Sequence, residues 1–75
     1  MRMKYAIEQR LRFIDFLVGV YGHINRNTIV EYFGISVPQV SNDFKMYIKM
    51  APNNIIYNTS LKRYDKTDKF KPLYK

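Results

Sequence analysis

Residues 25–50 decide the fold, and they read NRNTIVEYFGISVPQVSNDFKMYIKM. The segment opens on Asn25, a residue type that caps helices because its side-chain oxygen accepts a hydrogen bond from a first-turn amide. The short helix that follows has one apolar side, formed by Ile29, Val30 and Phe33. Gly34 comes next, and glycine readily adopts the left-handed backbone in which many helices end. The spacing therefore predicts a short helix that stops at Gly34 with a positive φ angle.

A second helix is predicted directly after this turn, over Val37 to Met50. Ser36 is a suitable N-cap, and Pro38 falls in the first turn, where a missing amide proton costs little. On a wheel of about 100° per residue, the residues within roughly 40° of Val40 are Phe44, Tyr47 and Ala51. We therefore expect Phe44 to be buried. Two helices joined by a short turn that contains glycine form the helix-turn-helix pattern.

The opposite face of this second helix carries amide, hydroxyl and ammonium groups. The residues on that face are Pro38, Gln39, Ser41, Asn42, Lys45, Met46 and Lys49. Such groups read base edges and contact phosphates in a DNA major groove, although a plain solvated helix face has a similar composition. Because the helix completes a helix-turn-helix, we favour the DNA-binding interpretation. We expect the residues that face the groove to be Gln39, Ser41, Asn42 and Lys45.

Two short strands are predicted after the helices. The segment 52–54, Pro-Asn-Asn, stops the helix, and the strands cover 55–58 and 63–65 around a polar connection. We place Tyr57 and Tyr64, like Tyr47, on inward faces. A basic hairpin in this position is the wing of a winged helix, and the residues expected to contact phosphates are Lys49, Lys62, Arg63 and Lys66. The sequence thus predicts a mainly α fold with a small β-hairpin: a winged helix-turn-helix of three helices plus a wing.

The chain before residue 25 predicts one long helix, from about Tyr5 to Tyr21. Its apolar face repeats at three- and four-residue spacing and consists of Ile7, Leu11, Ile14, Leu17, Val18 and Tyr21. Gly22 ends it, and His23 is placed in the turn that follows. A second apolar stripe needs cover from the C-terminal tail, the wing or a second copy of the chain, and it consists of Phe13, Phe16 and Val20. Since a DNA site with two half-sites needs two DNA-binding domains, we expect a weak homodimer.

Length and charge agree with this interpretation. Seventy-five residues allow one domain, which we place at 1–69, with 70–75 as a tail that is either a linker or packs on the first helix through Phe70 and Leu73. Residues 1–44 carry five basic and four acidic side chains, a net of +1, whereas residues 45–75 carry eight and two, a net of +6. A basic region on one part of a chain is the footprint of a polyanion partner.

Other classes of protein find little support in the residues. The chain has no cysteine and one histidine, His23, so we expect no metal site, no cofactor and no enzyme. We interpret Asp15 and Asp43 as helix-surface charges. The longest apolar run near the start, 16–21, is far shorter than the roughly 18 residues that span a bilayer. The lack of cysteine fits a reducing cytoplasm.

Four stretches of the sequence resemble the N-terminal domain of the BrxR/CapW-type regulators, which are WYL-domain transcriptional repressors associated with bacterial phage-defence islands. They are residues 10–17 (RLRFIDFL), 21–26 (YGHINR), 33–41 (FGISVPQVS) and 51–54 (APNN). The resemblance covers about residues 8 to 72. It implies a winged helix-turn-helix whose third helix enters the major groove of double-stranded DNA.

The resemblance also sets limits on what we expect. The family continues into a WYL domain and a dimerisation region that this sequence does not include, so we expect no small-molecule ligand. The function predicted from the residues and the resemblance is a sequence-specific, double-stranded-DNA-binding repressor in the cytoplasm. The alternative is a winged helix that docks a protein partner through the broad apolar face of its first helix, and salt-dependent binding to duplex DNA distinguishes the two.

Overall fold

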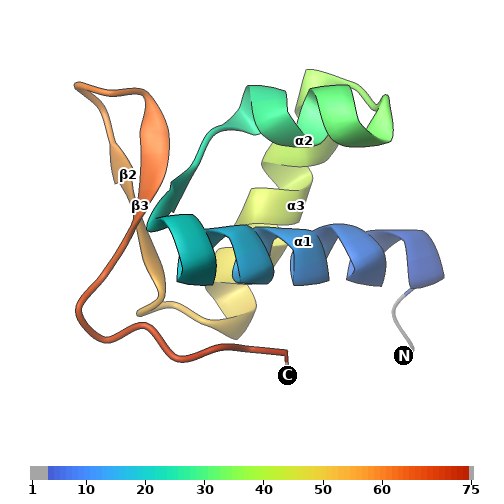
Figure 1. The fold of residues 1–75 in the computed structure, drawn as a ribbon. Helices are drawn as coiled ribbons and strands as arrows, with labels where there is room; N and C mark the ends of the chain where they lie inside the picture. Colours follow the sequence, from blue (N-terminus) through green and yellow to red (C-terminus); the bar gives the residue numbers. More distant parts are fainter. Residues whose placement is uncertain (1–3, 75) are drawn as a thin grey trace.

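Three helices and a small antiparallel sheet make up the fold in the computed structural model, which describes residues 4–74 (Figure 1). In chain order the elements are α1 (Tyr5–Tyr21), β1 (His23–Ile24), α2 (Arg26–Phe33), α3 (Val37–Met50), β2 (Ile55–Asn58) and β3 (Arg63–Lys66). The β2–β3 hairpin stands at one side of the helices, and the C-terminal segment runs along α1. This arrangement confirms the predicted fold class, three helices plus a wing, and the predicted bounds of α1 and α3.

The turns between the helices have the predicted chemistry. Gly22 and Gly34 both have left-handed backbones, with φ angles of 84° and 66°. The Asn25 side chain caps α2 by accepting a hydrogen bond from the Thr28 amide at 3.0 Å, and the Ser36 hydroxyl caps α3 in the same way. A left-handed backbone strains any residue with a Cβ, so glycine at these two positions fixes where α1 and α2 end.

The sheet contains one strand that the sequence did not predict. β1 pairs antiparallel with β3, in the register His23 with Asp65 and Ile24 with Tyr64, so the strand order is β1-β3-β2. The placement of His23 in a turn was therefore wrong. Two residues are too few to show the alternation of side chains that marks a strand in a sequence. β3 also runs one residue further than predicted, to Lys66, whose amide donates a hydrogen bond to the Gly22 carbonyl.

The core lies where α1, α3 and the wing meet. Its nine buried apolar residues are Leu11, Ile14, Val18, Ile24, Ile29, Val40, Phe44, Tyr47 and Ile55. Phe44 is fully buried, as predicted, and its ring stacks on that of Tyr64 with 4.2 Å between ring centres. This contact seats the wing directly on α3. The inward placement of Tyr57 was wrong, because that ring lies on the outer side of Tyr64 and is 43% exposed.

Two carboxylates that were assigned to the surface are in fact buried. Asp43 of α3 forms an ion pair with Arg10 of α1, in which Arg10 Nε lies 2.5 Å from Oδ2 and Nη2 lies 3.2 Å from Oδ1. Asp15 accepts hydrogen bonds from the Tyr47 hydroxyl at 2.5 Å and from the amides of two residues in the C-terminal segment. Burial and the hydrogen bond to Asp15 raise the pKa of Tyr47 well above its usual value. Polar bonds inside the core therefore join α1 to α3.

The C-terminal segment packs on the rest of the fold, which was one of the two alternatives left open. The amides of Leu73 and Tyr74 donate to Asp15 at distances of 2.9 to 3.0 Å. The Asn54 side chain donates to the Lys71 carbonyl at 2.7 Å and accepts from the Lys71 amide at 3.0 Å. Phe70 lies so close to Gly19 that a Cβ there would be 3.3 Å from its ring. The segment is therefore held both by side-chain packing and by its backbone.

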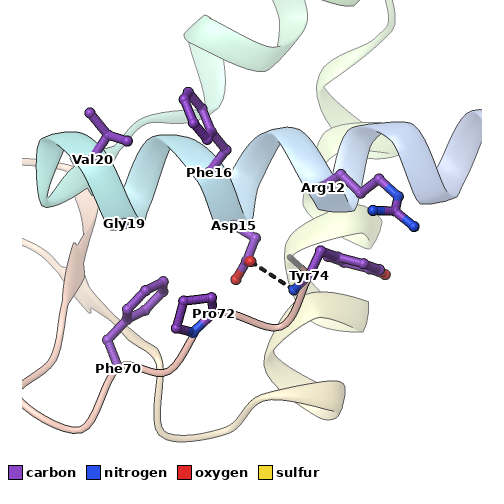
Figure 2. Close-up of a pocket in the computed structure, with 8 residues that line it drawn as sticks. All are labelled: Arg12, Asp15, Phe16, Gly19, Val20, Phe70, Pro72 and Tyr74. Carbon is purple, nitrogen blue, oxygen red and sulfur yellow. Dashed lines mark hydrogen bonds between the residues drawn. The ribbon is translucent and has the colours of Figure 1, made fainter.

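The second apolar stripe of α1 is only partly covered. Phe13 is half-buried, because its ring stacks on Tyr32 and meets the edge of Phe33. Phe16 and Val20 are 64% and 58% exposed and lie beside a groove between α1 and the C-terminal segment (Figure 2). Neither the tail nor the wing covers these two residues. Within residues 4–74, none of the helices has the length and apolar character to cross a membrane.

Candidate nucleic-acid interface

Helix α3 separates a core face from a polar face, as predicted. The core face is held by Val40, Phe44 and Tyr47, which are fully buried. On the opposite side the residues that the sequence assigned to DNA reading are exposed: Pro38, Gln39, Asn42, Lys45 and Lys49. Ser41 is half-buried at the edge of this face. The structure thus brings together the amide, hydroxyl and ammonium groups that can bind base edges and phosphates.

Ser41 is in contact with a residue that the sequence analysis missed. Arg26, the first residue of α2, donates a hydrogen bond from Nη1 to Ser41 Oγ at 3.2 Å. Fifteen residues separate the two in the chain, so helical periodicity gives no sign of the contact. A signal was available in the charge pattern, since Arg26 is the only lysine or arginine between Arg12 and Lys45. In the fold it adds a guanidinium to the edge of the polar face of α3.

The wing residues fall into two groups. Lys62 is exposed in the hairpin connection, where it is the only non-glycine residue among 4–74 with a positive φ, at 55°. Arg63 starts β3 and pairs through Nε with Asp65 Oδ1 at 2.7 Å. Hydrogen bonds from Asn58 and Arg63 hold the pKa of Asp65 below its ordinary value. Part of the Arg63 charge is therefore neutralised within the wing.

Lys66 lies apart from the other predicted phosphate contacts. It is at the end of β3 away from the hairpin connection, and its Nζ donates to the carbonyl of Gly19 in α1 at 3.3 Å. The same ammonium group is 5.6 Å from the ring centre of Phe70. The fold thus places Lys62 and Arg63 near the wing tip and Lys66 beside the C-terminal end of α1.

The described part of the chain offers no other built centre for chemistry. Residues 4–74 contain no group of three or more His, Cys, Asp or Glu side chains that could hold a metal ion. The buried carboxylates of Asp15 and Asp43 are both satisfied by protein donors. The α3 face with its neighbours Arg26 and Lys62 therefore remains the candidate functional site.

Comparisons with known proteins find relatives that are named as DNA-binding transcriptional repressors. The chain is 44% identical over 71 residues to the DNA-binding transcriptional repressor CapW of Escherichia coli (strain KTE188), a match that covers 95% of this chain and 24% of the relative. It is 41% identical to the CapW repressor of Pseudomonas aeruginosa, with the same coverage, and 36% identical to that of Stenotrophomonas maltophilia, over 99% of this chain and 25% of the relative. The chain thus spans about a quarter of the length of these curated relatives.

The family comparison covers nearly the whole chain. Residues 6–75 match the model of the BrxR transcriptional regulator winged helix-turn-helix domain. The three helices, the Gly34 turn and the hairpin seated on α3 are the parts that this description requires. The chain therefore belongs to the family of BrxR-type winged helix-turn-helix domains of transcriptional regulators.

Proposed function

We propose that this chain binds double-stranded DNA sequence-specifically, as the DNA-reading part of a transcriptional repressor. The observation that carries the proposal is the polar face of α3, which exposes Gln39, Asn42 and Lys45 while its other face is fully buried. The family and the names of the relatives, DNA-binding transcriptional repressors, support the same role. The proposal includes action in the cytoplasm and in phage defence, and it assigns no catalysis, cofactor or small-molecule ligand to these residues.

The polar groups of α3 suit base reading in the major groove. Gln39 and Asn42 carry side-chain amides, which can donate to and accept from adenine at the same time. A good pair of this kind is worth roughly 1–3 kcal/mol of discrimination against the wrong base. Lys45 reaches the same groove, and Lys49, about one turn further along α3, contacts phosphate.

The wing supplies contacts that do not depend on sequence. Lys62 and Arg63 present positive charge near the hairpin tip, and Lys66 adds charge beside α1. Each phosphate that a protein neutralises releases counterions, which makes binding weaken as salt is raised. Because Arg63 is already paired with Asp65, Lys62 is the cleaner position at which to measure this contribution.

A titration over salt concentration tests the proposal with two duplexes, the DNA upstream of the gene and a scrambled version of it. The variant Asn42→Ala should lose affinity for the upstream duplex by about five- to a hundredfold and for the scrambled duplex much less. Lys62→Ala and Arg63→Ala should weaken both duplexes similarly and lower the salt slope by about one. If none of the three variants changed DNA binding, the protein-docking alternative through α1 would replace the proposal.

The exposed part of α1 supports a second element of the proposal, a weak homodimer. Phe16 and Val20 are one turn apart on α1 and point away from the C-terminal segment, so they can meet the same residues of a second copy (Figure 2). Two winged helices held together match a DNA site with two half-sites. Sedimentation at increasing protein concentration should show a dimer that Phe16→Ser abolishes. Monomer at every concentration, with and without DNA, would count against the dimer.

A further inference from the structure

Arg26 lies beside the recognition helix α3 and close to the wing. Its guanidinium bonds to Ser41 Oγ of α3 at 3.2 Å. Tyr64 of β3 is within reach of its charge: burial raises the pKa of Tyr64, and the positive charge of Arg26 acts against that rise. The main chain explains the position, because Ile24, two residues earlier, pairs with Tyr64 across the sheet. Arg26 therefore touches the reading helix and lies close to the wing.

The charge of Arg26 is not neutralised by a carboxylate. Of the four arginines among residues 4–74, Arg10 pairs with Asp43, Arg12 with Glu8 and Arg63 with Asp65. Arg26 forms no such pair within that range, and its side chain is exposed. A guanidinium has five N–H donors in a fixed plane, and one of them is used on Ser41. The remaining donors face water at the rim of the polar face of α3.

The direction of the bond determines what Ser41 can do. An arginine can only donate, so Ser41 Oγ is the acceptor and its own hydroxyl proton is available to another acceptor. The bond also restricts the rotation of the Ser41 side chain. A serine held in this way presents a donor, which matches the purine N7 atoms, guanine O6 or thymine O4 in the major groove.

We propose that Arg26 and Ser41 act as one unit in DNA recognition. Arg26 contacts a backbone phosphate at the rim of the major groove, where its planar donors suit two phosphate oxygens, and it positions the Ser41 hydroxyl as a donor to a base edge. Arg26 is thus both a phosphate contact and a positioning residue for specificity. This inference rests on the proposed DNA-binding function.

The test separates the charge of Arg26 from its effect on Ser41. Arg26→Ala should lower the salt slope by about one, so that its affinity falls roughly 3.5-fold less than that of the unmodified chain between 50 and 200 mM salt. Arg26→Lys should keep the slope, because the charge stays. It should also lose roughly two- to tenfold in preference for the upstream over the scrambled duplex, because an ammonium group on a flexible stem does not hold Ser41. Ser41→Ala should lose the same preference with no change in slope.

A double variant and a control complete the experiment. The preference of Arg26→Lys/Ser41→Ala should be no lower than that of either single variant, because both changes remove the same oriented donor. Lys69→Ala removes an exposed charge from the C-terminal segment and should leave the preference unchanged. Thermal unfolding of each variant checks that the fold is kept.

Four outcomes would overturn the inference. If Arg26→Ala lowered the salt slope no more than Lys69→Ala does, Arg26 would make no phosphate contact. If the losses of duplex preference in the two single variants multiplied in the double variant, Arg26 and Ser41 would act independently and Arg26 would have no positioning role. If the unmodified chain bound no duplex DNA, the proposed function itself would fail. If the Arg26 variants bound DNA as the unmodified chain does, only the role of Arg26 would fail.

Discussion

Replacing Asp43 by alanine should bring this domain close to unfolding. Asp43 and Arg10 form an ion pair with side chains only 4% and 7% exposed, and two hydrogen bonds join them. Removing the carboxylate leaves a guanidinium inside the protein with no charge to balance it. Loss of one partner of a buried pair typically costs about 3–5 kcal/mol. Small domains have only about 5–15 kcal/mol of stability in total.

The same reasoning predicts how the stability can be restored. An apolar pair of similar volume, Arg10→Met with Asp43→Leu, removes both charges and leaves no unpaired group. Such replacements are often neutral or stabilising, so the double variant should be far more stable than Asp43→Ala alone. Glu8→Ala is the matched control, because it breaks the Arg12–Glu8 pair on the surface, where the loss should be below about 1 kcal/mol.

Thermal unfolding followed by far-UV circular dichroism measures all of these variants. For a domain of this size, each kcal/mol corresponds to roughly 4–8 °C in the midpoint of thermal unfolding. Asp43→Ala should therefore lower the midpoint by at least about 12 °C. A loss under 1 kcal/mol, equal to that of Glu8→Ala, would refute the view that the buried pair holds α1 against α3.

Other substitutions test other parts of the fold. Phe44→Ala should cost roughly 3–5 kcal/mol in unfolding free energy, because the ring is fully buried and stacks on Tyr64; an unchanged midpoint would contradict the packing of the wing. Lys62→Gly should stabilise the domain by up to about 1 kcal/mol, since it relieves the positive φ of 55°, and should still weaken DNA binding; a variant that binds as well as the unmodified chain would deny Lys62 a phosphate contact. The wing should loosen in acid, because the pKa of Asp65 is lowered in the fold, so its contribution is present above the ordinary value of 3.8 and is lost as pH falls through the lower folded value. Amide exchange in β3 measured at pH 5 and pH 3 checks this, and Asp65→Asn should remove the difference.

Local sequence signals were sufficient for most of the fold. The bounds of α1 and α3 followed from apolar spacing, and the ends of α1 and α2 followed from Gly22 and Gly34. These features depend on neighbours in the chain, which a sequence displays directly. β1 was missed because its only evidence is a partner, β3, about forty residues away.

The same distinction between local features and long-range contacts applies to the candidate site. The polar face of α3 could be predicted, because its residues recur at the period of one helix. The contact of Arg26 with Ser41 could not be predicted, since it depends on the angle at which α2 packs on α3 and on the pairing of β1 with the wing. The inward placement of Tyr57 was wrong for a related reason. Tyr57 shares the α3-facing side of the sheet with its cross-strand partner Tyr64, but it lies on the edge strand β2, where its ring stays 43% exposed, and the sequence does not show which strand is at the edge.

The buried carboxylates show where reasoning from residue type overrode better evidence. On the helical wheel Asp43 lies about 60° from Val40 and about 40° beyond Tyr47, and therefore at the edge of the core face. The charge of an aspartate favoured the surface, because charged groups are rarely buried unless they are paired. Arg10, one turn before Ile14 on α1, supplies that pair. An acidic residue on the apolar face of one predicted helix and a basic residue beside the apolar face of another should therefore be considered as candidate partners in the core before either is assigned to solvent.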